Sequence, residues 1–182
     1  PLQMAAAARA VLVDGVWRQP VVAPRSTTMP PQKVFSPKTV GKMRKLAGAV
    51  VARGTGRKAD VPGYSIGGKT GTSEKNIAGK YVGDKNLASF VGVAPLNDPE
   101  ILTFIMVDEP VEGGGGAVAA PAFKAYNQKA LALLNVPPEN NLPAVPIVAP
   151  DLLPKASQHA ANGTKQVSPP KNQAFALAYF NQ

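Results

Sequence analysis

Apolar residues recur at helical spacing in three parts of the chain. The middle part should begin as a helix at Ser36-Pro37, because Ser is a favoured N-cap and Pro fits the first helical position. In the last part Pro121 is acceptable, because it would fall within the first turn. The expected helices cover residues 1–13, 36–53 and 117–135.

Three strand candidates lie at residues 64–73, 87–94 and 101–108, and the last two are short apolar runs. The last two are separated only by "PLNDPE", a link too short to cross over to a parallel strand, so they should form an antiparallel hairpin. A Pro-bounded run over residues 16–24 is a candidate edge strand.

After Val136 no periodicity remains and proline recurs. Residues 137–182 therefore predict a Pro- and Ala-rich tail that is largely disordered, with a short helix in "AFALAYF" near its end. The folded part is expected to cover residues 1–136.

Composition narrows the possible chemistry. The chain has 182 residues, no Cys and a single His, which excludes thiol catalysis and argues against a His-based triad or a multi-His metal site. The net charge is +9, but the basic residues form no dense run interleaved with aromatics, which argues against specific nucleic-acid binding. Because the chain opens on Pro1 rather than Met, we expect it to be part of a longer protein.

The stretch "GYSIGGKTGTSEK" (residues 63–75) matches two functional motifs. From Gly63 it fits G-x-x-x-x-G-K-T, a phosphate-binding loop, and "ILTFIMVDE" (residues 101–109) could then supply an Asp for Mg²⁺. Such a loop must follow a buried strand and open a helix. Here no strand precedes it and three glycines follow closely, so a nucleotide-hydrolysing protein is the less favoured alternative.

The second motif is K-T-G-T, typical of penicillin-recognising serine acyltransferases. Lys69 would supply a cation and Thr70 a hydroxyl for a carboxylate, while Gly71 would let another backbone approach closely. The N–H of Thr72 would point at a developing oxyanion. The predicted substrate-binding residues are therefore Lys69, Thr70, Gly71 and Thr72, with Lys69 and Thr72 also catalytic.

The flanks of this motif resemble the C-terminal part of class B penicillin-binding proteins, particularly the division-type D,D-transpeptidases. The resemblance covers about residues 1–138, in family order and with similar spacing. It is carried by "PLQMAAAARA", "SPKTVGKMRKLAGAVV", "GTGRKADVPGYSIGGKTGTSEK", "SFVGVAPLNDPEILTFIMVDEP" and "GGAVAAPAFKAYNQKAL".

This resemblance implies an α+β fold, an antiparallel sheet packed by helices, present here as the C-terminal portion of a transpeptidase domain. The parent protein would cross-link peptidoglycan stem peptides ending in D-Ala-D-Ala through an acyl-serine, and β-lactams would acylate it. It would need no cofactor, metal or nucleotide and would not bind nucleic acid. It would lie at the periplasmic face of the cytoplasmic membrane, held by an anchor outside this chain, among other cell-division and cell-wall proteins.

The family's reactive Ser is not recognisable in this sequence. S-x-x-K occurs only as "SPPK" (residues 168–171), which follows K-T-G-T instead of preceding it and contains two prolines that oppose a helix. S-x-N is absent. We therefore expect the chain alone to be inactive, and a non-catalytic module that binds muropeptides or a partner remains an alternative.

Several other residues have simpler interpretations. His159 should be a solvated tail residue, and Asp108 and Glu109 should end a strand. The "GGGG" run should be a flexible connector. The cations at positions 53, 57 and 58 belong to a solvated loop by default, although they could favour an acidic partner.

Overall fold

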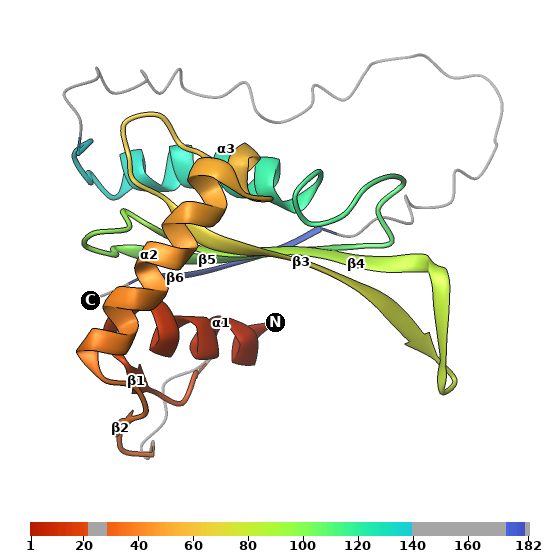
Figure 1. The fold of residues 1–182 in the computed structure, drawn as a ribbon, viewed down its shortest axis with the longest axis horizontal. Helices are drawn as coiled ribbons and strands as arrows, with labels where there is room; N and C mark the ends of the chain where they lie inside the picture. The colour runs from red at the N-terminus through yellow and green to blue at the C-terminus, as the bar shows by residue number, and fades with distance from the viewer. Residues whose placement is uncertain (22–28, 140–173, 181–182) are drawn as a thin grey trace, which may run out of the picture.

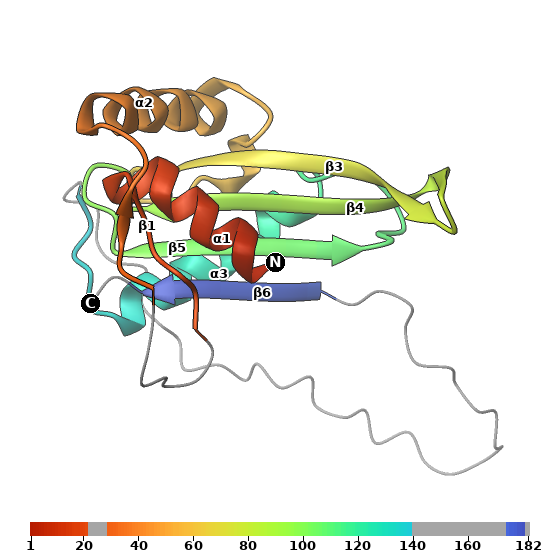
Figure 2. The same ribbon diagram turned by 90° about the horizontal axis from the view of Figure 1, so that it is seen from below.

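An antiparallel sheet with helices on both faces forms the centre of the molecule (Figure 1). The structure is a computed structural model that describes residues 1–21, 29–139 and 174–180. Helix α1 covers one face of the sheet and α3 the other, while α2 lies alongside the outer strand β3 (Figure 2). The elements are α1 (Leu2–Arg9), η1 (Ala10–Asp14), β1 (Val16–Trp17), β2 (Gln32–Lys33), α2 (Pro37–Arg53), η2 (Arg57–Ala59), β3 (Gly67–Ile77), β4 (Lys80–Ala94), β5 (Ile101–Asp108), α3 (Ala119–Leu133) and β6 (Ala174–Phe180).

The helices form close to where the sequence predicts them. Ser36 caps α2, with its Oγ accepting a hydrogen bond of 3.1 Å from the N–H of Thr39. Helix α1 is shorter than predicted, because the chain continues as the π-helix η1 before Gly15 turns it at a φ of 78°. Arg44 of α2 donates to the carbonyl oxygens of Leu12 and Val13, so it satisfies groups at this irregular helix end.

The sheet has the strand order β3-β4-β5-β6, and every neighbouring pair is antiparallel. The predicted hairpin of β4 and β5 is confirmed, and β5 has the predicted bounds. The predicted bounds of the preceding strands are wrong, because β3 and β4 extend into a hairpin arm whose turn is Ala78-Gly79, both with positive φ. The two strands of this polar arm pair with each other, and because they lack apolar alternation no sequence pattern predicts the extension.

The predictions for the two ends of the chain differ from the structure. In the described part of the run at 16–24, residues 16–21, Val16–Trp17 is a strand, as predicted, but it ends there and pairs with Gln32–Lys33 outside the main sheet. The segment 174–180 is not a helix but strand β6, which pairs with β5 in a register that sets Ile101 opposite Phe180. An isolated helix of that length would be marginal, whereas the edge of β5 offers unpaired backbone groups.

The chain remains packed on the domain for a few residues beyond α3. Glu139 donates its N–H to the carbonyl of Gly63, and its carboxylate accepts hydrogen bonds from Ser65 N–H and from Asn97. Burial raises the pKa of Glu139, but these hydrogen bonds outweigh it and leave the pKa below its usual value. Most of the predicted tail, residues 140–173 and 181–182, lies outside the described residues, so the boundary at 136 stays a prediction.

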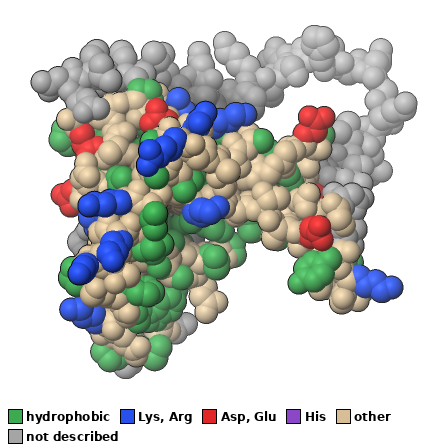
Figure 3. Space-filling model, viewed as in Figure 1, with side chains coloured by type: hydrophobic (Ala, Val, Ile, Leu, Met, Phe, Trp, Pro, Cys, Tyr) green, Lys and Arg blue, Asp and Glu red, His purple; other side chains and the backbone are tan. Residues whose placement is uncertain are grey.

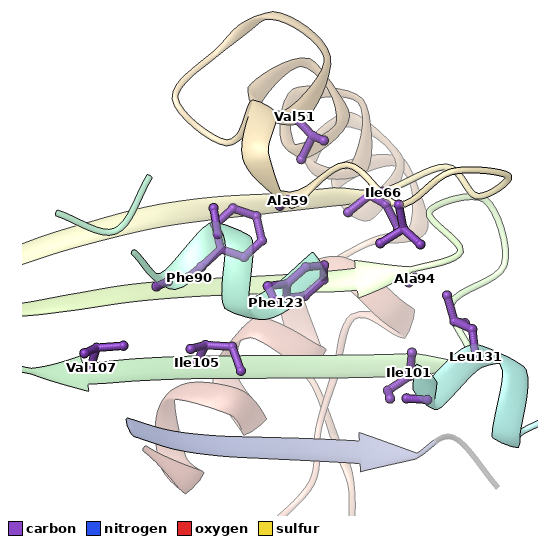
Figure 4. Packing of buried hydrophobic residues seen from close by; sticks show 14 of the residues in the cluster. Val51, Ala59, Ile66, Phe90, Ala94, Ile101, Ile105, Val107, Phe123 and Leu131 are labelled. Carbon is purple, nitrogen blue, oxygen red and sulfur yellow. The ribbon is translucent and has the colours of Figure 1, made fainter. Parts of the chain in front are cut away.

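Separate apolar clusters cover the two faces of the sheet. On the α3 side Phe90 packs edge-on against Phe123, with ring centroids 4.8 Å apart and both side chains fully buried (Figure 4). Buried in the same layer, Thr103 donates to Asn127, whose amide in turn donates to the carbonyl of Phe123. The cluster on the α1 side consists of Ala5, Leu12, Ala47, Val93, Leu102 and Phe104. Together the two clusters fix the plane of the sheet.

Candidate functional site

The predicted site residues 69–72 lie in the first half of β3, the outer strand of the sheet. On one side they pair with Val91, Phe90, Ser89 and Ala88 of β4. Within the described part of the chain, no strand pairs with the other edge of β3. An extended peptide could therefore add to this edge as a further strand.

Lys69 and Thr70 present polar groups close together. The exposed Lys69 ammonium donates to the carbonyl oxygen of Thr70 at 2.7 Å and to its Oγ1 at 3.2 Å. The hydroxyl of Thr70 also lies 2.7 Å from that of Thr55, which belongs to the loop after α2. A cation and two hydroxyls thus converge, as a carboxylate ligand requires.

Gly71 and Thr72 are held by the glycine-rich loop at residues 113–116. The N–H of Gly115 donates to Thr72 Oγ1 at 3.0 Å, which fixes this side chain. A Cβ on Gly115 would lie 2.2 Å from the Ser89 carbonyl oxygen and 2.5 Å from that of Gly71. The prediction that this loop is only a flexible connector is therefore wrong, because its glycines allow two backbones to touch.

Sequence reasoning did not find Thr55, Ser89 or the glycine loop as parts of this site. Ser89 lies opposite Gly71 in the register, and its Oγ would be 2.4 Å from a Cβ there. No motif spacing links these residues to K-T-G-T. Only the folded chain brings together positions that are 15 and 43 residues apart.

The other end of β3 is held by charge. Lys75 lies 2.9 Å from a carboxylate oxygen of Asp108 and 2.9 Å from one of Glu109. The hydrogen bond from Lys75 lowers the pKa of Glu109, although desolvation acts in the opposite direction. Bonds to the same two carboxylates raise the pKa of Lys75.

These observations disagree with the phosphate-loop interpretation. Strand β3 runs through Lys69 to Ile77, so no helix follows the motif. Asp108, which would have to hold Mg²⁺, is paired with Lys75 instead. Among the residues with described positions, no cluster of three or more His, Cys, Asp or Glu could hold a metal ion. His159 and the "SPPK" segment lie outside the described residues.

An apolar groove of about 290 Å³ lies beside Lys69. Its walls come from α1 and α2 and its floor from β3 and β4, and three of its large apolar side chains, Met4, Met43 and Leu46, are exposed. The lining residues are Met4, Ala7, Ala8, Val11, Leu12, Met43, Leu46, Ala47, Val50, Gly68, Lys69 and Val91. None of the helices described here is both long and apolar enough to cross a membrane.

Comparison with known families agrees with this architecture. The family model described as the penicillin binding protein transpeptidase domain matches residues 1–128. Stage V sporulation protein D of Bacillus subtilis is 35% identical over 156 residues, which are 78% of this chain and 24% of that protein. The "Probable peptidoglycan D,D-transpeptidase PenA" of Neisseria meningitidis is 35% identical over 157 residues, covering 82% of this chain and 26% of the relative. The chain thus spans about a quarter of the length of these relatives.

Solved structures show the same fold. The apo TP domain of penicillin-binding protein 3 from Burkholderia pseudomallei superposes with a TM-score of 0.66 at 40% identity, over 76% of this chain and 43% of that domain. Penicillin-binding protein 3 from Mycobacterium tuberculosis, complexed with ampicillin, gives a TM-score of 0.65 at 32% identity, over 79% of this chain and 37% of the neighbour. The α+β arrangement predicted from the sequence is confirmed.

Proposed function

The chain belongs to the penicillin-binding protein transpeptidase domain family, and from this premise we propose that it is the part of a peptidoglycan D,D-transpeptidase that grips the C-terminal carboxylate of the donor stem peptide. The observation that carries the proposal is the geometry around β3. Lys69 Nζ and Thr70 Oγ1 lie 3.2 Å apart on a strand whose outer edge accepts no other described strand.

Each residue of the motif has a separate task in this proposal. Lys69 attracts the carboxylate, and the hydroxyls of Thr70 and Thr72 hydrogen-bond it. Gly71 leaves room for the peptide backbone along the strand edge. The Thr72 N–H stabilises the oxyanion that forms when a Ser hydroxyl attacks the penultimate D-Ala carbonyl, a contribution worth about 3 kcal/mol for one preorganised donor.

The reaction itself needs a reactive Ser. This sequence has no S-x-x-K motif in a segment that could form a helix. In the parent protein that Ser would displace the terminal D-Ala, and an amine of a second stem peptide would then displace the Ser. A β-lactam would take the place of the donor, in line with the ampicillin bound by the Mycobacterium tuberculosis neighbour. Such a protein would act at the periplasmic face of the cytoplasmic membrane, with cell-division proteins as partners.

A binding experiment tests the carboxylate site on the chain as it stands. Calorimetry should show that a peptide ending in D-Ala-D-Ala binds, whereas the same peptide with a C-terminal amide does not. Lys69→Ala should weaken binding about ten- to a hundredfold, because a charge-assisted hydrogen bond contributes about 1.5–3 kcal/mol. Lys80→Ala removes another exposed cation from the hairpin arm and should have no effect. Equal binding of the acid and the amide would refute the proposal.

Labelling with a fluorescent penicillin separates binding from chemistry. We expect no adduct that survives denaturing electrophoresis, because no suitable Ser is recognisable in the sequence. A stable adduct would show that one of the Ser residues present is reactive. A non-catalytic muropeptide-binding module would also bind without labelling, but it should bind the amide as well as the acid if it recognises the rest of the muropeptide.

A further inference from the structure

The positive charge of this protein is concentrated in one stretch of sequence. Residues 15–59 contain ten Lys and Arg and no Asp or Glu, so the rest of the chain has ten Lys and Arg against eleven Asp and Glu. The whole net charge of +9 therefore arises from this stretch. The Lys and Arg residues are spread along the chain, but the Asp and Glu residues all lie outside residues 15–59.

Folding places much of this charge on the outer side of α2. The helix buries Val40, Ala47 and Val51 on one side, and at 100° per residue Lys38, Lys42 and Lys45 point almost directly away from them. The basic ridge defined here consists of Lys38, Lys42, Lys45, Arg53, Arg57 and Lys58, all exposed. In Figure 3 Lys and Arg side chains form a band where α2 lies in Figure 1.

The ridge has no internal counter-charge within the described structure. All the ion pairs found there involve other cations, namely Arg9, Arg18, Lys75 and Lys85. Arg44, the remaining cation of α2, is used within the fold, where it donates to carbonyl groups. The charges of the ridge repel one another and lower the stability of the folded chain unless an anion lies against them.

The ridge ends next to the motif strand. Arg53 is the last residue of α2, and the loop that follows is tied to β3 by the 2.7 Å contact between Thr55 and Thr70. Arg57 in turn donates to the carbonyl of Arg53. A polyanion on α2, which is about 25 Å long at 1.5 Å per residue, would therefore lead to the edge of β3.

We propose that the basic ridge binds the carboxylate-rich peptides of the peptidoglycan polymer and holds the strand whose end enters the site at Lys69. This inference rests on the proposed function for its choice of polymer. Peptidoglycan presents carboxylates on successive stem peptides, so a row of cations along a helix matches a row of anions along the polymer. Flexible Lys side chains suit such a partner, because their charges can follow uneven spacing.

A membrane surface fits the ridge less well. A helix that lies on a bilayer needs an apolar stripe next to its basic face. The apolar side chains of α2 either are buried or, like Met43 and Leu46, line the groove shared with α1. On this face of α2 the positions between the lysines hold only Gly and Ala, at 41, 49 and 52, and the exposed Leu46 at the edge of this face lies at the groove.

Two triple variants of equal charge test the ridge. Lys38→Gln, Lys42→Gln and Lys45→Gln together should reduce co-sedimentation with purified, teichoic-acid-free peptidoglycan about tenfold at low salt. The control combines Lys80→Gln, Lys124→Gln and Lys129→Gln, which remove the same charge elsewhere and should change binding by less than about twofold. Binding should weaken as ionic strength rises from about 0.01 to 0.15 M, as the Debye length falls from about 30 to 8 Å.

Two further binding measurements distinguish peptidoglycan carboxylates from other anionic partners. Peptidoglycan whose carboxylates have been amidated should not bind, and vesicles containing phosphatidylglycerol should bind far more weakly than peptidoglycan. Equal loss in the two triple variants, retained binding of amidated peptidoglycan, or ridge-dependent binding to vesicles as tight as to peptidoglycan would each overturn the proposal. Melting temperatures of both triple variants should be measured to check that each is folded.

The same variants separate this inference from the proposed carboxylate site. The ridge variant should still bind the short D-Ala-D-Ala peptide, because none of its changes touches β3. Lys69→Ala should bind that peptide more weakly but still co-sediment with the polymer. If the ridge proposal is refuted, the proposed carboxylate site is therefore unaffected, and the reverse also holds.

Discussion

The two halves of β3 are neighbours in sequence but are held in different ways. Residues 67–72 contact α2, the glycine loop and Phe90, and Gly67, Gly68 and Gly71 allow the closest of these approaches. Residues 73–77 extend into the arm, beyond a register shift at Glu74/Lys75, where charge pairs at Lys75 replace packing. The first half is thus positioned by close packing, whereas the second half is held by partly buried charge pairs.

The largest loss of stability should come from removing the Phe90 ring, which packs against the first half of β3. Phe90→Ala should lower the free energy of unfolding by about 3–5 kcal/mol, because a fully buried ring and its edge-on contact with Phe123 are lost. Urea denaturation measures this. Tyr81→Ala on the arm, where the side chain is 73% exposed, should change it by less than about 0.5 kcal/mol. Similar losses in the two variants would show that the halves are not held differently.

A smaller loss should follow from crowding the contact between the glycine loop and β3. Gly115→Ala places a Cβ 2.2 Å from the carbonyl oxygen of Ser89, and forcing the backbones apart should cost about 1–3 kcal/mol. The displaced Gly115 N–H would also release Thr72, so peptide binding should weaken in calorimetry. At Gly83 in the arm an added Cβ meets nothing within 4 Å, and Gly83→Ala should be nearly neutral. An unchanged free energy of unfolding in Gly115→Ala would mean that the loop can move away from β3 without loss of stability.

The smallest effect is expected from the charge pairs of the second half. Lys75→Gln should raise the pKa of Glu109 toward its ordinary value of 4.5, because Lys75 is the main cause of the lowered pKa. A carboxyl with a lowered pKa stabilises the fold above about 4.5, and this contribution is lost as pH falls through the folded-state pKa. NMR titration of the Glu109 carboxyl measures the shift.

Lys80→Gln serves as the control for this titration, because no ion pair in the described structure involves Lys80. It should leave the pKa of Glu109 unchanged. Equal titration curves for the protein and the Lys75→Gln variant would mean that Lys85, 3.6 Å from Glu109, sets its pKa instead. In that case the arm would not depend on the charge pairs at the register shift.

The contrast between the halves also explains which parts of the site were predictable. The Lys69–Thr72 motif is local, because its chemistry lies in four consecutive residues, and the strand they form was expected. Thr55 and Gly115 belong to the same site, but their contribution depends on hydrogen bonds to residues 15 and 43 positions away. No local periodicity encodes such a contact, which requires the sheet and both loops to be in place.

The sequence alone determined α2 with its Ser36 cap, the hairpin of β4 and β5, and helix α3, because each depends on local interactions. It also determined the family. Tertiary structure decided the rest. Strand β6 joins the sheet because β5 has an open edge, and the glycine loop becomes part of the site because its backbone lies against β3. The cations spaced along residues 38–58 lie on an outer surface because α2 buries its opposite side, Val40, Ala47 and Val51, against the rest of the fold. Each of these features depends on neighbours that are distant in sequence.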